Sequence, residues 1–182
     1  HSFPTRRSSD LRKIKREEVV VVSKVGYLQG QNYQLSQQRK QAGKPFQDLV
    51  EYGHGLEHCI HPEFIEDQLT RALQRLQMDK LEVYLLHNPE YYLNWATHHG
   101  IALDQARKEY YRRIKLAFEH LEKEVQKGRI SYYGISSNSF AHSANDFDFT
   151  SLEKVYEIAQ SLGAKHHFQI IQLPMNLIDR KS

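Results

Sequence analysis

The stretch that decides the fold runs from Arg71 to Pro89 and reads RALQRLQMDKLEVYLLHNP. After a helix end and a short turn comes the run Leu81 to Leu86, whose residues are mostly apolar, aromatic or β-branched. Such a run is typical of a strand that is covered on both faces in a parallel sheet. Proline disfavours helix at the residue before it, so the chain leaves the sheet where His87 emerges. Ligands bind at this end of the strands in α/β sheets and barrels, which makes His87 the first candidate functional residue.

The composition limits the classes of protein to consider. The chain has 182 residues, of which 40% are hydrophobic and 26% are charged, and these are ordinary values for a globular domain. Its formal net charge is only +3, with basic and acidic residues interleaved, so we expect no nucleic-acid partner. Because no apolar run is long enough to cross a bilayer, we also expect no membrane association. The lone cysteine, Cys59, excludes an internal disulfide and suits a reducing compartment, which predicts a cytoplasmic location.

The two ends of the chain differ from the rest. Residues 1–11, HSFPTRRSSDL, have neither the apolar segment of a signal peptide nor an amphipathic pattern, and they resemble a translated sequencing adapter. We predict that they are a non-native leader without ordered structure. At the other end, Asn176 to Ser182 offers no closing element. We therefore expect one domain, residues 12–182, that is an internal fragment of a larger protein.

Strands and helices are predicted to alternate along that domain. Strands are expected at 19–23, 81–86, 129–135 and 168–173, and helices at 62–76, 103–127 and 152–162. Apolar and β-branched runs indicate the strands, and apolar residues at helical spacing indicate the helices. This order implies right-handed crossovers and a parallel sheet, which leaves two architectures, a doubly wound sheet and a barrel.

Two segments between these elements show no sustained period. Tyr27 to Ile60, rich in Gln, Gly, Tyr and His, is predicted to be a long loop that either forms part of a substrate pocket or is mobile. Glu90 to Gly100 is also predicted to be a loop. Its aromatic residues either line a pocket or form a small core of their own.

A histidine and cysteine cluster in the first loop invites a metal-binding interpretation. It consists of His54, His58, Cys59 and His61. The spacing matches none of the structural zinc patterns, and the acidic residue that a catalytic zinc site needs is not evident. We therefore predict no metal site, and a metal-dependent barrel hydrolase is the least favoured interpretation.

The positions of polar residues favour the barrel. No strand is followed by G-x-G-x-x-G or G-x-x-x-x-G-K-[ST], the phosphate-binding turns of nucleotide-binding doubly wound domains. Lys24, His87, the polar run from Ser136, and Gln172 or Asn176 fall at the carboxyl ends of four different strands. Lys24 also has a plainer interpretation as a solvated loop lysine, and the polar run equally suits a turn. We predict an α/β fold, a (β/α)8 TIM barrel present as an incomplete fragment of about four parallel β/α units.

Three segments carry a resemblance to a known family. They are Arg16–Lys24 (REEVVVVSK), Leu73–His87 (LQRLQMDKLEVYLLH) and Lys127–Ser137 (KGRISYYGISS). In this order, and together with the Gln172 strand, they resemble the aldo-keto reductases, barrel enzymes that use NADPH or NADH. The resemblance implies an NAD(P)H-dependent carbonyl reductase or alcohol dehydrogenase. It would transfer a hydride between nicotinamide and a small-molecule aldehyde or ketone.

The resemblance also assigns roles to two residues. The family works with a tyrosine acid, a lysine beside it, a histidine and an aspartate, and here Lys24 matches the lysine and His87 the histidine. A neighbouring ammonium favours phenolate and so makes a tyrosine a better proton donor. The histidine would orient the carbonyl by hydrogen bonding.

The cofactor contacts follow from the same resemblance. Ser136 and Ser137 match the family's Ser-Asn pair, which holds the nicotinamide carboxamide, and Gln172 matches its glutamine partner. The second position of the pair is Ser137 where asparagine is commoner, with Asn138 displaced by one residue. Which of these two side chains reaches the cofactor is therefore left open.

The departures from the family pattern matter as much. The family's aspartate and tyrosine have no match here and are expected upstream of the first strand. The strands that supply a stacking tyrosine and the adenosine phosphate pocket are expected beyond Ser182, so the fragment by itself is expected to be inactive. The alternative is a non-catalytic, reductase-like binding or regulatory subunit.

Overall fold

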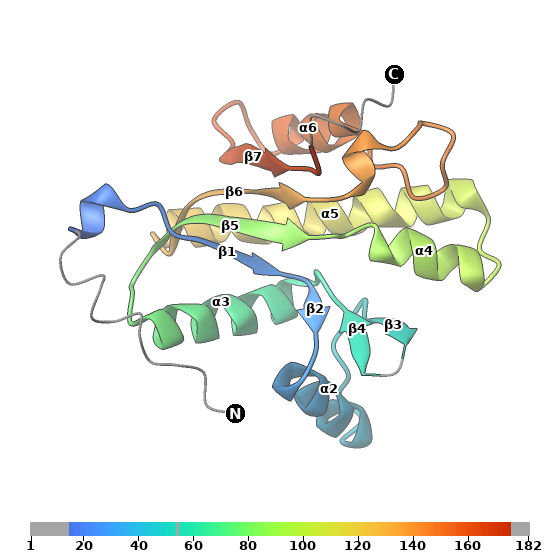
Figure 1. Ribbon diagram of the computed structural model, residues 1–182, viewed down its shortest axis with the longest axis horizontal. Coiled ribbons are helices and arrows are strands. Elements are labelled where there is room, and N and C mark those ends of the chain that lie inside the picture. The colour runs from blue at the N-terminus through green and yellow to red at the C-terminus, as the bar shows by residue number, and fades with distance from the viewer. Residues whose placement is uncertain (1–14, 54, 176–182) are drawn as a thin grey trace.

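The computed structural model describes residues 15–53 and 55–175, and its central element is a four-stranded parallel sheet (Figure 1). The strands are β1 (Val22–Val25), β5 (Leu81–His87), β6 (Ile130–Ser136) and β7 (Phe168–Gln172), in the order β1-β5-β6-β7. The sheet is not closed, and β1 and β7 are its edges. This arrangement is a partial (β/α)8 barrel, which confirms the predicted fold class.

Three helices cover one face of this sheet. They are α3 (Pro62–Leu76), α5 (Leu103–Gln126) and α6 (Leu152–Ser161), all close to the predicted ranges. Pro62 occupies the first helical position of α3, and His61 caps the helix by accepting a hydrogen bond from Glu63 N at Nδ1. Gly128, with φ at 74°, follows the end of α5 in the left-handed conformation that favours glycine.

The core lies between the sheet and the helices. The side chains that fill it are almost completely buried: Tyr84 and Leu86 from β5, Tyr133 and Ile135 from β6, and Ile114, Phe118 and Leu121 from α5. Burial of one such side chain stabilises the fold by roughly 1.5–3 kcal/mol. The apolar residues of α3 are buried against the sheet except Leu76, which is 42% exposed in the last turn of the helix.

The segment Tyr27 to Ile60 is not a loop, so that prediction is wrong. It forms β2 (Tyr27–Leu28), α2 (Gln31–Gln41), β3 (Val50–Gly53) and β4 (Leu56–His58), and the strands make an antiparallel sheet in the order β2-β4-β3. The helix reads QNYQLSQQRKQ, which has no apolar face, and the strands are two to four residues long. Neither pattern produces a periodic signal, so only the folded structure reveals these elements.

A second predicted loop and the start of the first strand also differ from the prediction. The segment Glu90 to Gly100 contains a helix, α4 (Tyr91–His98), where a loop was predicted. The first strand begins at Val22, three residues later than predicted, and it is preceded by a short 3-10 helix, η2 (Arg16–Glu18). A second one, η3 (Ser139–Ala141), follows β6. In the part of the chain that the structure describes, no helix has the length and apolar composition to cross a bilayer.

The predicted leader, residues 1–11, lies outside the described residues, as do His54 and Asn176.

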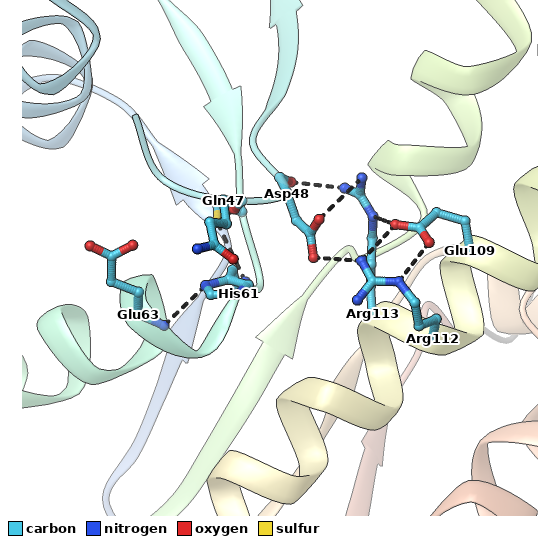
Figure 2. Close-up of polar contacts among 8 residues, drawn as sticks. Gln47, Asp48, His61, Glu63, Glu109, Arg112 and Arg113 are labelled. Carbon is cyan, nitrogen blue, oxygen red and sulfur yellow. Dashed lines mark hydrogen bonds and ion pairs between the residues drawn. The ribbon is translucent and has the colours of Figure 1, made fainter. Parts of the chain in front are cut away.

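The segment from β2 to β4 is fastened to α5 by charged contacts (Figure 2). Asp48 Oδ2 accepts a hydrogen bond from Arg112 Nη2 at 2.8 Å, and its backbone oxygen accepts one from Arg113 Nη1 at 2.8 Å. Glu109, one turn earlier on α5, accepts from both guanidinium groups at 2.6 and 2.8 Å. The Arg113 guanidinium also lies 4.0 Å from the ring centre of Tyr92. These contacts join the segment to α5, and Arg113 joins α5 to α4.

We predict that Gly134→Ala disrupts the pairing of β6 with β7. A Cβ atom on Gly134 would lie 1.8 Å from the carbonyl oxygen of Ile170, so a strand has to move. The expected loss in the free energy of unfolding is about 3 kcal/mol, measured by urea denaturation. The matched control is Gly53→Ala, because a Cβ there meets no atom of the described residues within 4 Å. Equal stability of the two variants would contradict the pairing at Gly134.

Candidate active site

Four of the six predicted site residues project from one face of the parallel sheet. His87 pairs with Ser136, and Ser136 pairs with Gln172. Lys24 pairs with Leu85, two residues before His87 on β5. Because side chains alternate along a strand, Lys24, His87, Ser136 and Gln172 share the face turned away from the helices. In a closed (β/α)8 barrel this face is the interior, and its carboxyl end carries the active site.

A hollow of about 270 Å³ lies at this end of the sheet. All six predicted residues line it: Lys24, His87, Ser136, Ser137, Asn138 and Gln172. They come from four strands and the turn after β6, as the sequence pattern suggested. The structure therefore brings together the complete set of candidates.

Lys24 reaches the hollow from the edge strand β1. Its Nζ donates a hydrogen bond to Ser136 Oγ at 3.1 Å, although β5 lies between the two strands. This contact fixes a positive charge beside His87 without neutralising it, because its partner is a hydroxyl group. Such a charge stabilises a phenolate or a developing oxyanion in its vicinity.

His87 is half-buried at the end of β5. Burial lowers the pKa of its imidazole, and the nearby charge of Lys24 lowers it further. The ring is therefore neutral at pH 7 and keeps one N–H that can donate to a carbonyl oxygen. The ring of Tyr27 meets it edge to face, with 4.8 Å between the ring centres.

A chain of buried hydroxyl groups stands behind the end of β6. Ser137 Oγ lies 3.0 Å from Ser139 Oγ, and Ser139 Oγ lies 2.7 Å from Thr150 Oγ1. Thr150 Oγ1 in turn lies 2.8 Å from Tyr110 OH. Ser137 also accepts from the backbone N–H of Ser139 at 3.1 Å. The Ser137 hydroxyl is thus committed to structural hydrogen bonds within the protein.

Asn138 differs from Ser137 in its exposure and in the hydrogen bonds of its side chain. It is exposed, and its side-chain amide makes no hydrogen bond within residues 15–53 and 55–175. Its backbone N–H donates to Glu90 Oε1 at 3.0 Å. Glu90 is buried, which raises the pKa of its carboxyl group. Sequence reasoning missed Glu90, whose only signal was an acidic residue directly after the His-Asn-Pro turn.

An aromatic cluster beside His87 was also missed. Tyr27, Tyr52 and His58 come from the strands β2 to β4, and all three pack against Tyr91 of α4, with ring centres 5.1, 4.4 and 5.5 Å away. Tyr27 OH accepts a hydrogen bond from Asn88 Nδ2 at 2.6 Å. The segment that was predicted to be a loop therefore lies against the turn that follows His87.

The three described members of the histidine and cysteine cluster do not converge on a metal position. His58 Nε2 lies 2.7 Å from the carbonyl oxygen of His87, and Cys59 Sγ donates to Gln47 O at 3.3 Å. The His61 ring caps α3 by accepting from the backbone N–H of Glu63 (Figure 2). Each side chain thus has a structural role.

We predict that His58 makes stability depend on pH. Complete burial lowers its pKa from 6.5 to about 4, so below pH 6.5 the unfolded state binds a proton that the folded state excludes. Stability from this group is present above pH 6.5 and is lost as the pH falls toward 4, by about 2 kcal/mol between pH 7 and pH 5.

Urea denaturation at pH 7 and at pH 5 measures the loss in the free energy of unfolding. In His58→Gln this loss should be smaller than in the wild type by about 2 kcal/mol. His98→Gln, at an exposed position, is the matched control. An unchanged pH dependence in His58→Gln would contradict the prediction.

Comparison with known proteins gives a family match and several similar solved structures. The model of the aldo/keto reductase family matches residues 7–181. No curated protein matches the chain. Similar solved structures include an aldo-keto reductase from Bacillus halodurans in its holo form, with 22% identity, a TM-score of 0.40 and coverage of 71% of this chain and 30% of that one. The glycerol dehydrogenase from Gluconobacter oxydans shares 17% identity, with a TM-score of 0.47 and coverage of 91% and 35%.

The chain also resembles aldose reductase from Giardia lamblia, with 16% identity, a TM-score of 0.45 and coverage of 90% of this chain and 39% of that one. It thus spans well under half the length of each of these three structures. The family model, in contrast, extends over nearly the whole sequence. This match shows that the chain belongs to the aldo/keto reductase family.

Proposed function

We propose that the chain is part of an NAD(P)H-dependent carbonyl reductase that acts on a small aldehyde or ketone. One observation supports this most strongly: the Lys24 ammonium, the His87 imidazole and the polar end of β6 all line one hollow. These groups are the cation, the hydrogen-bond donor and the amide-binding surface that reduction of a carbonyl by a nicotinamide requires.

The residues of the hollow fit a nicotinamide carboxamide. A carboxamide has one acceptor oxygen and an NH₂ donor, so it is matched best by side chains that offer both kinds of group. Asn138 and Gln172 each carry such an amide, and both line the hollow. Ser137 does not compete for this role, since its hydroxyl is held in the buried chain. We therefore propose Asn138 and Gln172 as the principal carboxamide ligands, with Ser136 beside Lys24.

When bound, the cofactor supplies the hydride, and the residues of this chain orient the carbonyl group. The neutral imidazole of His87 donates a hydrogen bond to the carbonyl oxygen and so fixes its position. Lys24 stabilises the negative charge that grows on that oxygen as its carbon accepts the hydride. Both interactions strengthen in the transition state, because the oxygen carries more charge there.

The proton that completes the reaction must come from another group. Tyr27 lies against His87, but burial raises its pKa and makes it a poor acid near neutrality. Its hydroxyl is also the acceptor of the hydrogen bond from Asn88. No tyrosine of the described residues lines the hollow. We therefore propose that a tyrosine outside this sequence is the acid, and we expect the 182-residue chain alone to show no turnover.

Two substitutions test the proposed roles in the protein encoded by the full open reading frame. Lys24→Met and His87→Gln should each lower kcat/KM for aldehyde reduction by about 100-fold or more, because each removes a group that acts on the reacting oxygen. The assay follows the loss of nicotinamide absorbance with a panel of aldehydes.

Lys44→Met is the control, because Lys44 does not line the hollow. The full protein is a binding or regulatory subunit instead if it binds the cofactor without turnover. The same conclusion follows if neither Lys24→Met nor His87→Gln changes the turnover.

Asn138→Ala and Ser137→Ala should separate cofactor binding from stability. Asn138→Ala should raise the Kd for the nicotinamide cofactor about 10-fold, with an unchanged melting temperature, because it removes an exposed amide. Ser137→Ala should leave the Kd nearly unchanged and lower the free energy of unfolding by about 1–2 kcal/mol, because it breaks the buried hydroxyl chain. Titration of cofactor fluorescence and urea denaturation measure the two effects, and the reverse pattern would assign the carboxamide to Ser137.

A further inference from the structure

A second cluster of titratable side chains lies between α3 and α5, away from the hollow. It consists of Glu66 on α3 and of His120 and Glu124, one turn apart, on α5. His120 Nε2 lies 3.6 Å from Glu66 Oε2 and 3.6 Å from Glu124 Oε1. All three ligand atoms lie within 4.8 Å of one another. None of these residues lines the hollow, so the cluster is independent of the proposed function.

Hydrogen bonds among the described residues leave the His120 ring nitrogen of this cluster without a partner. The Glu124 side chain is 0% exposed, and His120 Nε2 is buried without a hydrogen-bond partner among the described residues. A distance of 3.6 Å is too long for a hydrogen bond to either carboxylate. A buried nitrogen that faces two carboxylates without a hydrogen bond is costly unless another group satisfies it.

We propose that Glu66, His120 and Glu124 bind a divalent transition-metal ion, with Zn²⁺ as the best match to the donor set. Zn²⁺ takes imidazole nitrogen and carboxylate oxygen at about 2.0–2.2 Å, so tetrahedral ligand atoms lie about 3.3 Å apart. The two distances of 3.6 Å from His120 Nε2 are close to that value. Water would take the fourth position. The ion would hold α3 against α5, and its role would be structural.

Arg129 orients the two carboxylates toward the proposed ion. Its Nη1 lies 2.5 Å from Glu66 Oε1 and 3.1 Å from Glu124 Oε2. These are the oxygens that do not face His120, so the guanidinium itself does not occupy the pair that would act as ligands. An outer-shell partner of this kind fixes ligand orientation in metal sites.

The Lys127 ammonium contacts the two carboxylate oxygens that would bind the proposed ion. Its Nζ lies 2.7 Å from Glu124 Oε1 and 3.6 Å from Glu66 Oε2, the same two oxygens that face His120. The Lys127 side chain is 54% exposed, so it can turn into solvent. The ammonium and the metal ion therefore compete for one position, and this competition distinguishes a metal site from a network of ion pairs.

The test uses the 182-residue chain after treatment with a chelator, titrated with Zn²⁺ in a calorimeter. We expect one Zn²⁺ per chain, a Kd on the order of micromolar and a higher melting temperature with zinc. His120→Gln should weaken binding at least 10-fold, and Lys127→Gln should tighten it about 10-fold. Two matched controls should change the Kd less than about twofold: Lys115→Gln, an exposed lysine of α5, and His142→Gln, a half-exposed histidine beside Asp148.

Two results would overturn the proposal: zinc binding that His120→Gln leaves unchanged, or a Lys127→Gln affinity equal to that of the wild type. Because Lys127 is on the surface, its variant gives a decisive answer even if His120→Gln fails to fold. Co²⁺ provides a second measurement, since tetrahedral coordination by nitrogen and oxygen gives an intense visible absorption. The absence of that absorption in the Co²⁺-loaded wild type would also overturn the proposal.

Discussion

The candidate active site depends on the register of the parallel sheet. β5 is hydrogen-bonded between β1 and β6, which aligns His87 with Ser136, and the pairing of β6 with β7 aligns Ser136 with Gln172. A slip of one residue in either pairing would turn these polar side chains into the helix layer. It would also expose Tyr84 and Tyr133, which are buried beneath the helices. The apolar core therefore holds the polar residues in position, although Tyr84 and Tyr133 do not line the hollow.

Buried polar groups then decide which side chains of the turn after β6 face the hollow. The hydroxyl chain from Ser137 to Tyr110 fixes one serine inside, and Glu90 holds the backbone of Asn138 from behind. Hydrogen bonds of this kind are costly to break, because each leaves a buried group without a partner. A sequence of short polar residues thus divides into a structural serine and an exposed asparagine. The division is set by residues of α5 and of the segments before α4 and α6.

The sequence predicted the parts of this fold that have a strong local signal. The four parallel strands, the three covering helices and the six residues of the hollow follow from apolar periods and from polar residues at strand ends. The elements α2 and α4 were missed because α2 has no apolar face and α4 has only two turns. Glu90 was missed because its partner, the backbone N–H of Asn138, is 48 residues away in sequence. Long-range contacts of this kind leave no local pattern.

Lys24 differs from two other lysines of the molecule in the groups that surround its charge. Lys40 lies between Glu51 and Glu57, and Lys127 lies between Glu66 and Glu124. Their charges are neutralised locally, and such pairs contribute mainly to holding elements together. Lys24 forms no ion pair in the part of the chain that the structure describes, and its hydrogen-bond partner is the Ser136 hydroxyl. Its positive potential therefore extends into the hollow beside His87. A carboxylate partner at the same place would offset that potential, whereas the neutral hydroxyl group of Ser136 leaves it in place.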